Sequence, residues 1–163
     1  MMFKAEQIAL AGMHGSQAVE QYIETSKLMG HTWITDTVYA EGIIQGSSGI
    51  NKATLWFNYT MIPGIELELL SYELGPNWLS GRVSNDRLVP SHYGMHCTEE
   101  ELPDYIEQFA KHDIMVVQHV NTFKHTSAAV NAAGRQYTYV IFGARHLLGC
   151  DLKLIVRRDA ADR

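Results

Sequence analysis

The chain has 163 residues, 46% of them hydrophobic and 19% charged, a composition that fits one globular domain or two small modules. Its formal net charge of −5 argues against nucleic acid or an anionic membrane as a partner. No apolar run reaches the ~18 residues of a membrane-spanning helix, and the first residues lack a secretion signal. Cys97 and Cys150 form no CxxC pair, so we expect reduced, buried thiols in a cytoplasmic protein.

The first half of the chain has the pattern of a strand, a helix and three more strands. A short apolar strand at residues 6–11 precedes a helix that Ser16 caps and that ends near Gly30. Runs rich in β-branched and aromatic residues predict strands at residues 33–39, 53–61 and 65–72. The stretch 41–51 is rich in Gly and Ser, and we expect it to be a mobile loop.

The second half repeats this order after a connector at residues 75–90. A strand at 91–97 leads to a helix that begins either at a Thr98/Glu101 capping box or at Pro103 and ends near residue 112. Further strands are predicted at residues 114–120, 136–142 and 150–156. Residues 122–135 are predicted to form a second long polar loop, and the charged tail 157–163 is expected to fray.

The two halves also match in sequence. A shift of 85 positions aligns residues 57–70 with residues 142–155, and identical residues then meet at four places: Phe57/Phe142, Gly64/Gly149, Leu67/Leu152 and Leu69/Leu154. The same shift places Gln7 on His92, each in a short segment before a predicted helix. Agreement at both ends of the halves predicts a duplicated module.

A duplicated chain of this kind resembles the vicinal oxygen chelate superfamily, which includes glyoxalases, bleomycin-resistance proteins and extradiol dioxygenases. The resemblance covers about residues 4–157 and rests on the duplication, the run His92-Tyr93-Gly94-Met95-His96 and the run Glu68-Leu69-Leu70. It implies an α+β fold of two tandem βαβββ modules, residues 1–74 and 91–163, whose curved mixed sheets form a central groove. It also implies a homodimer.

Metal-dependent members of that superfamily hold a divalent metal with four side chains that line the groove. The matching positions here are Gln7, Glu68, His92 and Lys153. The first three are suitable ligands for Zn, Ni, Mn or Fe. The fourth departs from the pattern, because a lysine ammonium has no lone pair with which to bind a metal.

Strand alternation indicates what Lys153 does instead. Lys153 and Asp151 share one strand face, and Glu68 shares a face with Glu66, so Lys153 is expected to meet Glu68 inside the groove. Such a pair would replace the charge of the metal and avoid an unpaired buried carboxylate. The alternative is a three-ligand metal site that His96 completes from the face of His92.

Several other residues are candidates for binding the substrate. Tyr137 and Tyr139 share a strand face, where they either pack in the core or orient a substrate oxygen. His125 and Arg135, together with Lys124, lie in the predicted loop 122–135 and form either a solvated loop or a cationic lid. Trp78 either stacks on a ligand at the groove mouth or packs in the core.

Two functions follow from the resemblance. The first is a glyoxalase-like enzyme that abstracts a proton beside a carbonyl of a small oxygen-rich substrate, with Glu68, Lys153 and Tyr139 as catalytic candidates. Extradiol ring cleavage fits less well, because Gln7 and Lys153 do not supply its two histidines and one carboxylate. The second is a metal-free protein that binds or sequesters a small molecule.

Overall fold

The computed structural model describes residues 1–159, and these form eight strands and four helices. The first half contains β1 (Gln7–Ala11), α1 (Gln17–Leu28), β2 (Ile34–Ile44), β3 (Ser47–Asn58) and β4 (Glu66–Leu74). The second half contains β5 (Val89–His96), α2 (Leu102–Ala110), β6 (Val116–His125), α3 (Ala128–Ala132), β7 (Gln136–Phe142), α4 (Arg145–Leu148) and β8 (Asp151–Arg158). The predicted α+β class is confirmed.

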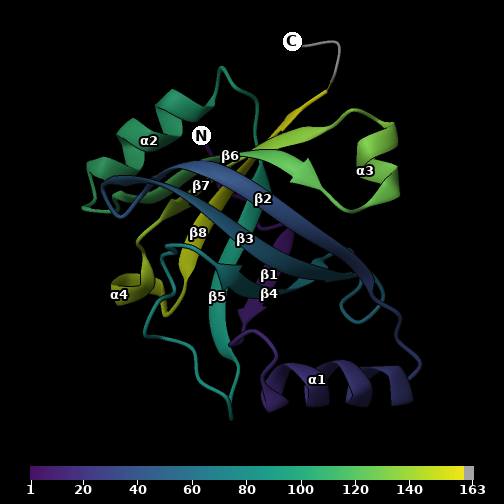
Figure 1. Ribbon diagram of the computed structural model, residues 1–163. Coiled ribbons are helices and arrows are strands. Elements are labelled where there is room, and N and C mark those ends of the chain that lie inside the picture. The colour runs from purple at the N-terminus through teal and green to yellow at the C-terminus, as the bar shows by residue number, and fades with distance from the viewer. Residues whose placement is uncertain (160–163) are drawn as a thin grey trace.

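The eight strands form one closed barrel in the order β1-β4-β3-β2-β6-β7-β8-β5 (Figure 1). Each half is a mixed sheet, because β1 pairs with β4 and β5 pairs with β8 in parallel, while the other pairs within a half are antiparallel. The halves meet along two antiparallel seams, β1 with β5 and β2 with β6. The central groove expected from the sequence is therefore the inside of this barrel.

The predicted loop at residues 41–51 is wrong, because this stretch forms the end of β2, a tight turn and the start of β3. Gln45 and Gly46 make the turn with positive φ angles of 49° and 82°. Gly42 lies inside β2, where a Cβ atom would come within 2.1 Å of the carbonyl oxygen of His119 on β6. Gly42 therefore serves a close approach of two strands rather than a mobile loop.

The second predicted loop, 122–135, is also wrong over most of its length. β6 continues to His125, and Ser127 then caps the short helix α3 by accepting a hydrogen bond from the Val130 amide at 3.4 Å. The tail prediction is wrong for residues 157 and 158, which belong to β8, and its remaining part from residue 160 lies outside the described residues.

The helix α1 begins as the sequence predicts, whereas α2 begins at Leu102, next to the alternative start at Pro103, although the predicted Thr98/Glu101 hydrogen bonds precede it. Ser16 caps α1 by accepting from the Val19 amide at 3.3 Å. Before α2, Thr98 accepts from the Glu101 amide at 3.2 Å and Glu101 accepts from the Thr98 amide at 2.9 Å, which completes the capping box. The two helices lie on different sides of the barrel (Figure 1).

Strand alternation gives β8 two different faces. Leu152, Leu154 and Val156 face outward into an apolar cluster under α2, where the ring of Phe109 meets Phe142 edge-on at 4.9 Å. Lys153 points the other way and lines the inside of the barrel. Within residues 1–159, no helix is long and apolar enough to span a bilayer.

Candidate functional site in the barrel

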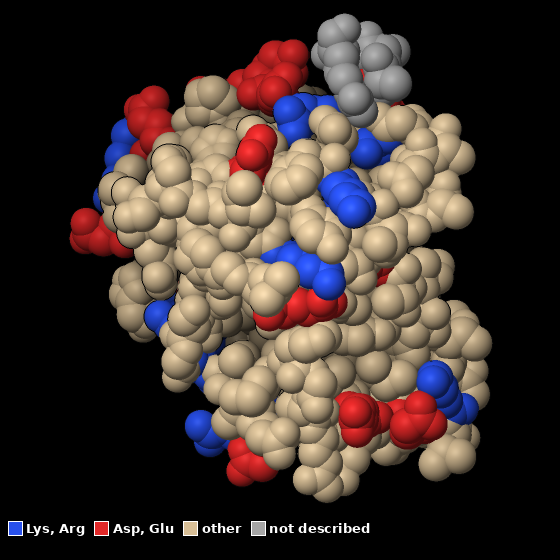
Figure 2. Space-filling model, in the orientation of Figure 1, with Lys and Arg blue, Asp and Glu red and all other residues tan. Residues whose placement is uncertain are grey.

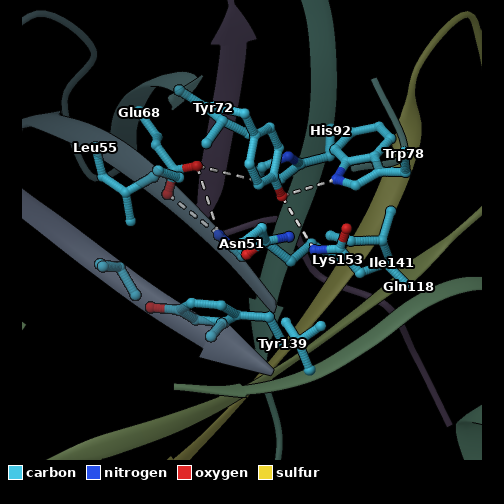
Figure 3. A pocket seen from close by; sticks show the side chains of 15 residues that line it. Asn51, Leu55, Glu68, Tyr72, Trp78, His92, Gln118, Tyr139, Ile141 and Lys153 are labelled. Atoms are coloured by element: carbon cyan, nitrogen blue, oxygen red, sulfur yellow. Dashed lines mark hydrogen bonds and ion pairs between the residues drawn. The ribbon is translucent and has the colours of Figure 1, made fainter. Parts of the chain in front are cut away.

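Four polar side chains from four neighbouring strands meet inside the barrel: Gln7 of β1, Glu68 of β4, His92 of β5 and Lys153 of β8. None of them is more than 4% exposed. Figure 3 shows the side chain of Lys153 reaching toward Glu68. The ion pair predicted from strand alternation is present, with 3.2 Å between Lys153 Nζ and Glu68 Oε2.

Gln7 connects the other members of this group, which we call the central cluster. Its side-chain amide nitrogen donates to Glu68 Oε2 at 3.0 Å and also to Glu66. Its carbonyl oxygen accepts from His92 Nε2 at 2.9 Å and from Lys153 Nζ at 3.4 Å. Each polar group of the central cluster therefore has a partner inside the protein, as burial demands.

His92 is neutral in this arrangement. Burial lowers the pKa of His92 well below its ordinary value, and the positive charges of Lys153 and Arg145 lower it further. Because Nε2 donates to Gln7, Nδ1 carries the lone pair and accepts from the Ser91 hydroxyl at 2.8 Å.

Glu68 has the opposite shift. Burial raises the pKa of the Glu68 carboxyl, and the nearby negative charge of Glu66 adds to this effect, while Lys153 and Gln7 oppose it. A carboxylate with a raised pKa is a stronger base than an exposed one, which is the property that proton abstraction requires.

A glycine makes room for this arrangement. Gly94 lies between the neighbouring strands, opposite Gln7 on one side and opposite Lys153 on the other. A Cβ atom at Gly94 would lie 2.7 Å from Gln7 Oε1 and 3.0 Å from Gln7 Cβ. The absence of a side chain here lets Gln7 enter the barrel.

The central cluster separates two cavities. Glu68, Lys153 and Tyr139 line both of them. The inner cavity holds only about 30 Å³, and Trp78 and Tyr72 are among the residues that line it. The Tyr72 hydroxyl accepts a hydrogen bond from Trp78 Nε1 at 3.2 Å (Figure 3). The outer cavity holds about 230 Å³, so a small molecule can reach the central cluster from that end.

The two candidate tyrosines lie beside Lys153 on the wall of the outer cavity. Tyr137 and Tyr139 stack with their ring centroids 5.8 Å apart. Lys153 Nζ lies 4.5 Å from the centroid of the Tyr139 ring, a cation–π contact. Burial raises the pKa of Tyr139 well above its ordinary value, so its hydroxyl stays protonated.

The expected cationic lid separates into three different environments. Arg135 lines the outer cavity, and its Nε lies 3.5 Å from Asp159 Oδ1. His125 is buried in β6, where Nδ1 lies 2.7 Å from Asp36 Oδ2 and Nε2 lies 2.8 Å from Thr122 Oγ1, so its placement in a lid is wrong. Lys124 lies 4.9 Å from the ring of Tyr39.

Trp78 and His96 do not lie where a role in ligand or metal binding would place them. Trp78 is 3% exposed and packs in the core beside the inner cavity, so its placement at the groove mouth is wrong. His96 lies on the wall of the outer cavity, and its Nδ1 contacts the Glu6 carboxylate at 2.9 Å. That contact draws His96 toward Glu6 at an exposed position rather than into the central cluster.

Sequence reasoning left out Glu66 and Asp36, which both line the outer cavity. Glu66 accepts from Gln7, and its hydrogen bond with Tyr59 adds to the effect of burial in raising the pKa of that tyrosine. The position of Glu66 on the same strand face as Glu68 could have identified it as a residue of the site. Asp36 gave no such signal, because its partner His125 is 89 residues away.

A divalent metal, which the resemblance implies, does not fit these donors. The Lys153 ammonium has no lone pair and directs its protons at the oxygens of Glu68 and Gln7, the atoms that would have to face the metal. Over residues 1–159, no three side chains of His, Cys, Asp or Glu are grouped so that they could hold a metal ion.

The comparison with known proteins supports the fold. No model of a protein family matches the sequence, and neither does any curated protein. The hypothetical protein BH1468 from Bacillus halodurans C-125 has a TM-score of 0.53 and 12% identity, with 98% of each chain covered. A mutant of 4-hydroxymandelate synthase from Streptomyces coelicolor has a TM-score of 0.52 and 11% identity, with 96% of this chain and 49% of that chain covered. At these identities the likeness shows a shared fold alone, and this fold agrees with the tandem βαβββ modules that the sequence predicts.

Proposed function

We propose that this protein is an enzyme that moves a proton beside a carbonyl of a small, oxygen-rich molecule bound in the outer cavity. The observation that carries this proposal is the contact between a buried ammonium, Lys153, and a carboxylate of raised pKa, Glu68, at the floor of that cavity. The cavity volume of about 230 Å³ suits a small substrate.

Each group has a defined part in the proposed reaction. The carbonyl oxygen of the substrate accepts a hydrogen bond from Lys153 Nζ, which stabilises the negative charge that develops there. Glu68 takes the proton from the neighbouring carbon, and the resulting enolate is reprotonated to complete an isomerisation or epimerisation. The protonated hydroxyl of Tyr139 orients the substrate, and Arg135 attracts an anionic group at the cavity wall.

A second candidate function is metal-free binding of a small molecule without chemistry. The observation that favours it is the complete hydrogen bonding of the central cluster, in which Glu68 and His92 both bond to Gln7. A base that is held in this way must exchange a partner before it can accept a proton from a substrate.

Proton exchange in D₂O distinguishes the two candidates. The purified protein is incubated with EDTA and with a panel of 2-oxo acids and α-hydroxy ketones, and loss of each carbon-bound proton is followed by ¹H NMR. The enzyme proposal expects exchange on at least one compound, slowed by roughly 10²–10⁴-fold in Glu68→Gln and unchanged in Glu24→Gln on the exposed face of α1.

The other outcomes are equally informative. Saturable binding of a panel compound with no proton exchange supports the binding protein and contradicts the enzyme. Exchange that stops in EDTA contradicts a metal-free mechanism. Binding that is unchanged by Arg135→Gln and by Tyr139→Phe argues against the outer cavity as the site for either function.

A further inference from the structure

We infer that Lys153 is a built-in cation that takes the place of a divalent metal, and that exchanging this one residue for a ligand would create a metal site. This inference holds whether the protein is an enzyme or a binder, because it concerns the central cluster alone. Four features of the central cluster support this inference. They are its balance of charge, the hydrogen bonds that Lys153 donates, the space that a shorter side chain at position 153 would leave, and the hydrogen bond between His92 and Ser91.

The charges of the central cluster balance without a metal. Lys153 Nζ lies 3.2 Å from Glu68 Oε2, so the carboxylate already has a cation beside it, and the side-chain amide of Gln7 carries no charge. A divalent cation placed among these groups would add two buried positive charges beside an ammonium, which is strongly unfavourable. Lys153→Glu would instead provide two carboxylates, whose charge a divalent metal neutralises.

The hydrogen bonds of Lys153 show that it acts as a cation and not as a neutral amine ligand. Its Nζ lies 3.2 Å from Glu68 Oε2, 3.5 Å from Glu68 Oε1 and 3.4 Å from Gln7 Oε1. All three atoms are acceptors, so Nζ must supply protons to each of them. The face of the Tyr139 ring, 4.5 Å away, also favours a positive charge.

The space around position 153 suits an ion when the lysine is shortened. A glutamate side chain ends one atom earlier than lysine, so Lys153→Glu would leave a gap between its carboxylate and that of Glu68. Metal–oxygen bonds of about 2.0–2.2 Å on each side would fill such a gap. Gly94 keeps this part of the barrel free of a further side chain.

The partner of His92 is already in place for metal binding. In the wild type, Nε2 donates its proton to Gln7, and Nδ1 accepts from Ser91 at 2.8 Å. To bind a metal through Nε2, the imidazole would carry its proton on Nδ1 instead. The Ser91 hydroxyl oxygen would then accept a hydrogen bond from that Nδ1–H group. Such an outer partner fixes the tautomer of a metal-binding histidine.

The test compares the wild type with Lys153→Glu, Lys153→His and Lys153→Gln. Each protein is incubated with Ni²⁺, Zn²⁺, Mn²⁺ or Co²⁺ alone and desalted. We then measure its metal content, its melting midpoint with and without metal, and the visible absorption of the Co²⁺ form. The glutamine variant is the matched control, because it has the length of glutamate without its charge.

We expect about one metal ion per chain in Lys153→Glu and Lys153→His, with a higher melting midpoint in metal and a Co²⁺ spectrum typical of protein ligands. The wild type should keep no metal, Lys153→Gln should bind at least tenfold more weakly than Lys153→Glu, and adding Glu68→Gln should abolish binding. Lys153→His keeps the test valid if a second buried carboxylate prevents folding.

Three results would overturn the inference. The first is a wild-type protein that retains one metal ion per chain and loses it on Glu68→Gln. The second is a folded Lys153→Glu and a folded Lys153→His that both remain metal-free. The third is a failure of both variants to fold even when metal is present during refolding.

Discussion

Glu68 and Lys153 stand 85 residues apart in the chain, and their side chains meet at 3.2 Å inside the barrel. Gln7 and His92 are separated by the same 85 residues and meet at 2.9 Å. Each pair joins equivalent positions of the two halves, and within each pair the two residues are chemically complementary: a carboxylate with an ammonium, and an amide with an imidazole. The polar side chains at the centre of the barrel thereby find their hydrogen-bond partners in the other half of the chain.

The buried pair leads to a prediction about stability. Lys153→Met leaves the Glu68 carboxylate buried without its cation, so we expect the free energy of unfolding at pH 7 to fall by about 3–5 kcal/mol. Urea denaturation measures this change. The double variant Lys153→Met/Glu68→Leu should lie within about 2 kcal/mol of the wild type, since it replaces the pair by apolar groups of similar size.

The control for this prediction is an exposed ion pair. Lys111 lies 2.8 Å from Glu107 on α2, and both side chains are more than half exposed. Lys111→Met should change the free energy of unfolding by less than about 1 kcal/mol, because solvent screens such pairs. Equal effects of Lys153→Met and Lys111→Met would contradict the importance of the buried pair.

Gly94 leads to a second prediction. A methyl group there would press on the Cβ and Oε1 atoms of Gln7, so Gly94→Ala should lower the free energy of unfolding by about 1–3 kcal/mol. In a Gln7→Ala background the obstructing side chain is gone, and the same substitution should then cost clearly less. Two equal costs in urea denaturation would show that the strain lies elsewhere.

The central cluster was predictable because it follows from two regular patterns. The shift of 85 residues identifies equivalent positions, and strand alternation then directs Glu68 and Lys153 to the inside. Both the 85-residue shift and the strand alternation can be read from the sequence alone, without knowing which distant segments pair. The succession of one strand, one helix and three further strands along each half was predictable for the same reason.

The two loop predictions are wrong because the structure of these segments depends on pairing with distant strands. Gly42 and Gly49 give residues 41–51 the composition of a loop, yet this stretch is a hairpin whose β2 strand also pairs with β6 from the other half. His125 belongs to β6 because it pairs with Val38 and binds Asp36, which is 89 residues away. Local composition does not encode such distant pairing.

The two thiols lead to a third prediction. Burial raises the pKa of Cys97 to about 11, and the negative charge of Glu101 contributes to this shift. Because the thiolate is the reactive form, native Cys97 should react with iodoacetamide at pH 8 roughly 100-fold more slowly than the unfolded chain. Mass spectrometry with and without urea measures the rates. Burial also raises the pKa of Cys150, so rapid native labelling of either thiol would contradict its position in the fold.

The seam between β2 and β6 leads to the last prediction, which concerns Asp36. Its Oδ1 accepts from the amides of Thr126 at 2.9 Å and Ser127 at 2.8 Å, and its Oδ2 accepts from His125. We expect Asp36→Asn to lower the free energy of unfolding at pH 7 by about 2–4 kcal/mol, because charge-assisted hydrogen bonds are lost at a buried site. Asp104→Asn on the exposed side of α2 is the control and should cost less than about 1 kcal/mol.

The pH dependence of this effect has a definite sign. Burial alone would raise the pKa of Asp36, but the hydrogen bonds from His125, Ser127 and Thr126 hold it below its ordinary value of 3.8. The unfolded chain therefore takes up the proton first as the pH falls, so the stabilisation is complete above pH 3.8 and is lost as the pH passes through the native pKa. The difference in unfolding free energy between Asp36→Asn and the wild type should accordingly shrink as the pH falls below 3.8. A difference that stays constant down to pH 2.5 in urea titrations would mean that the Asp36 charge does not hold this seam together.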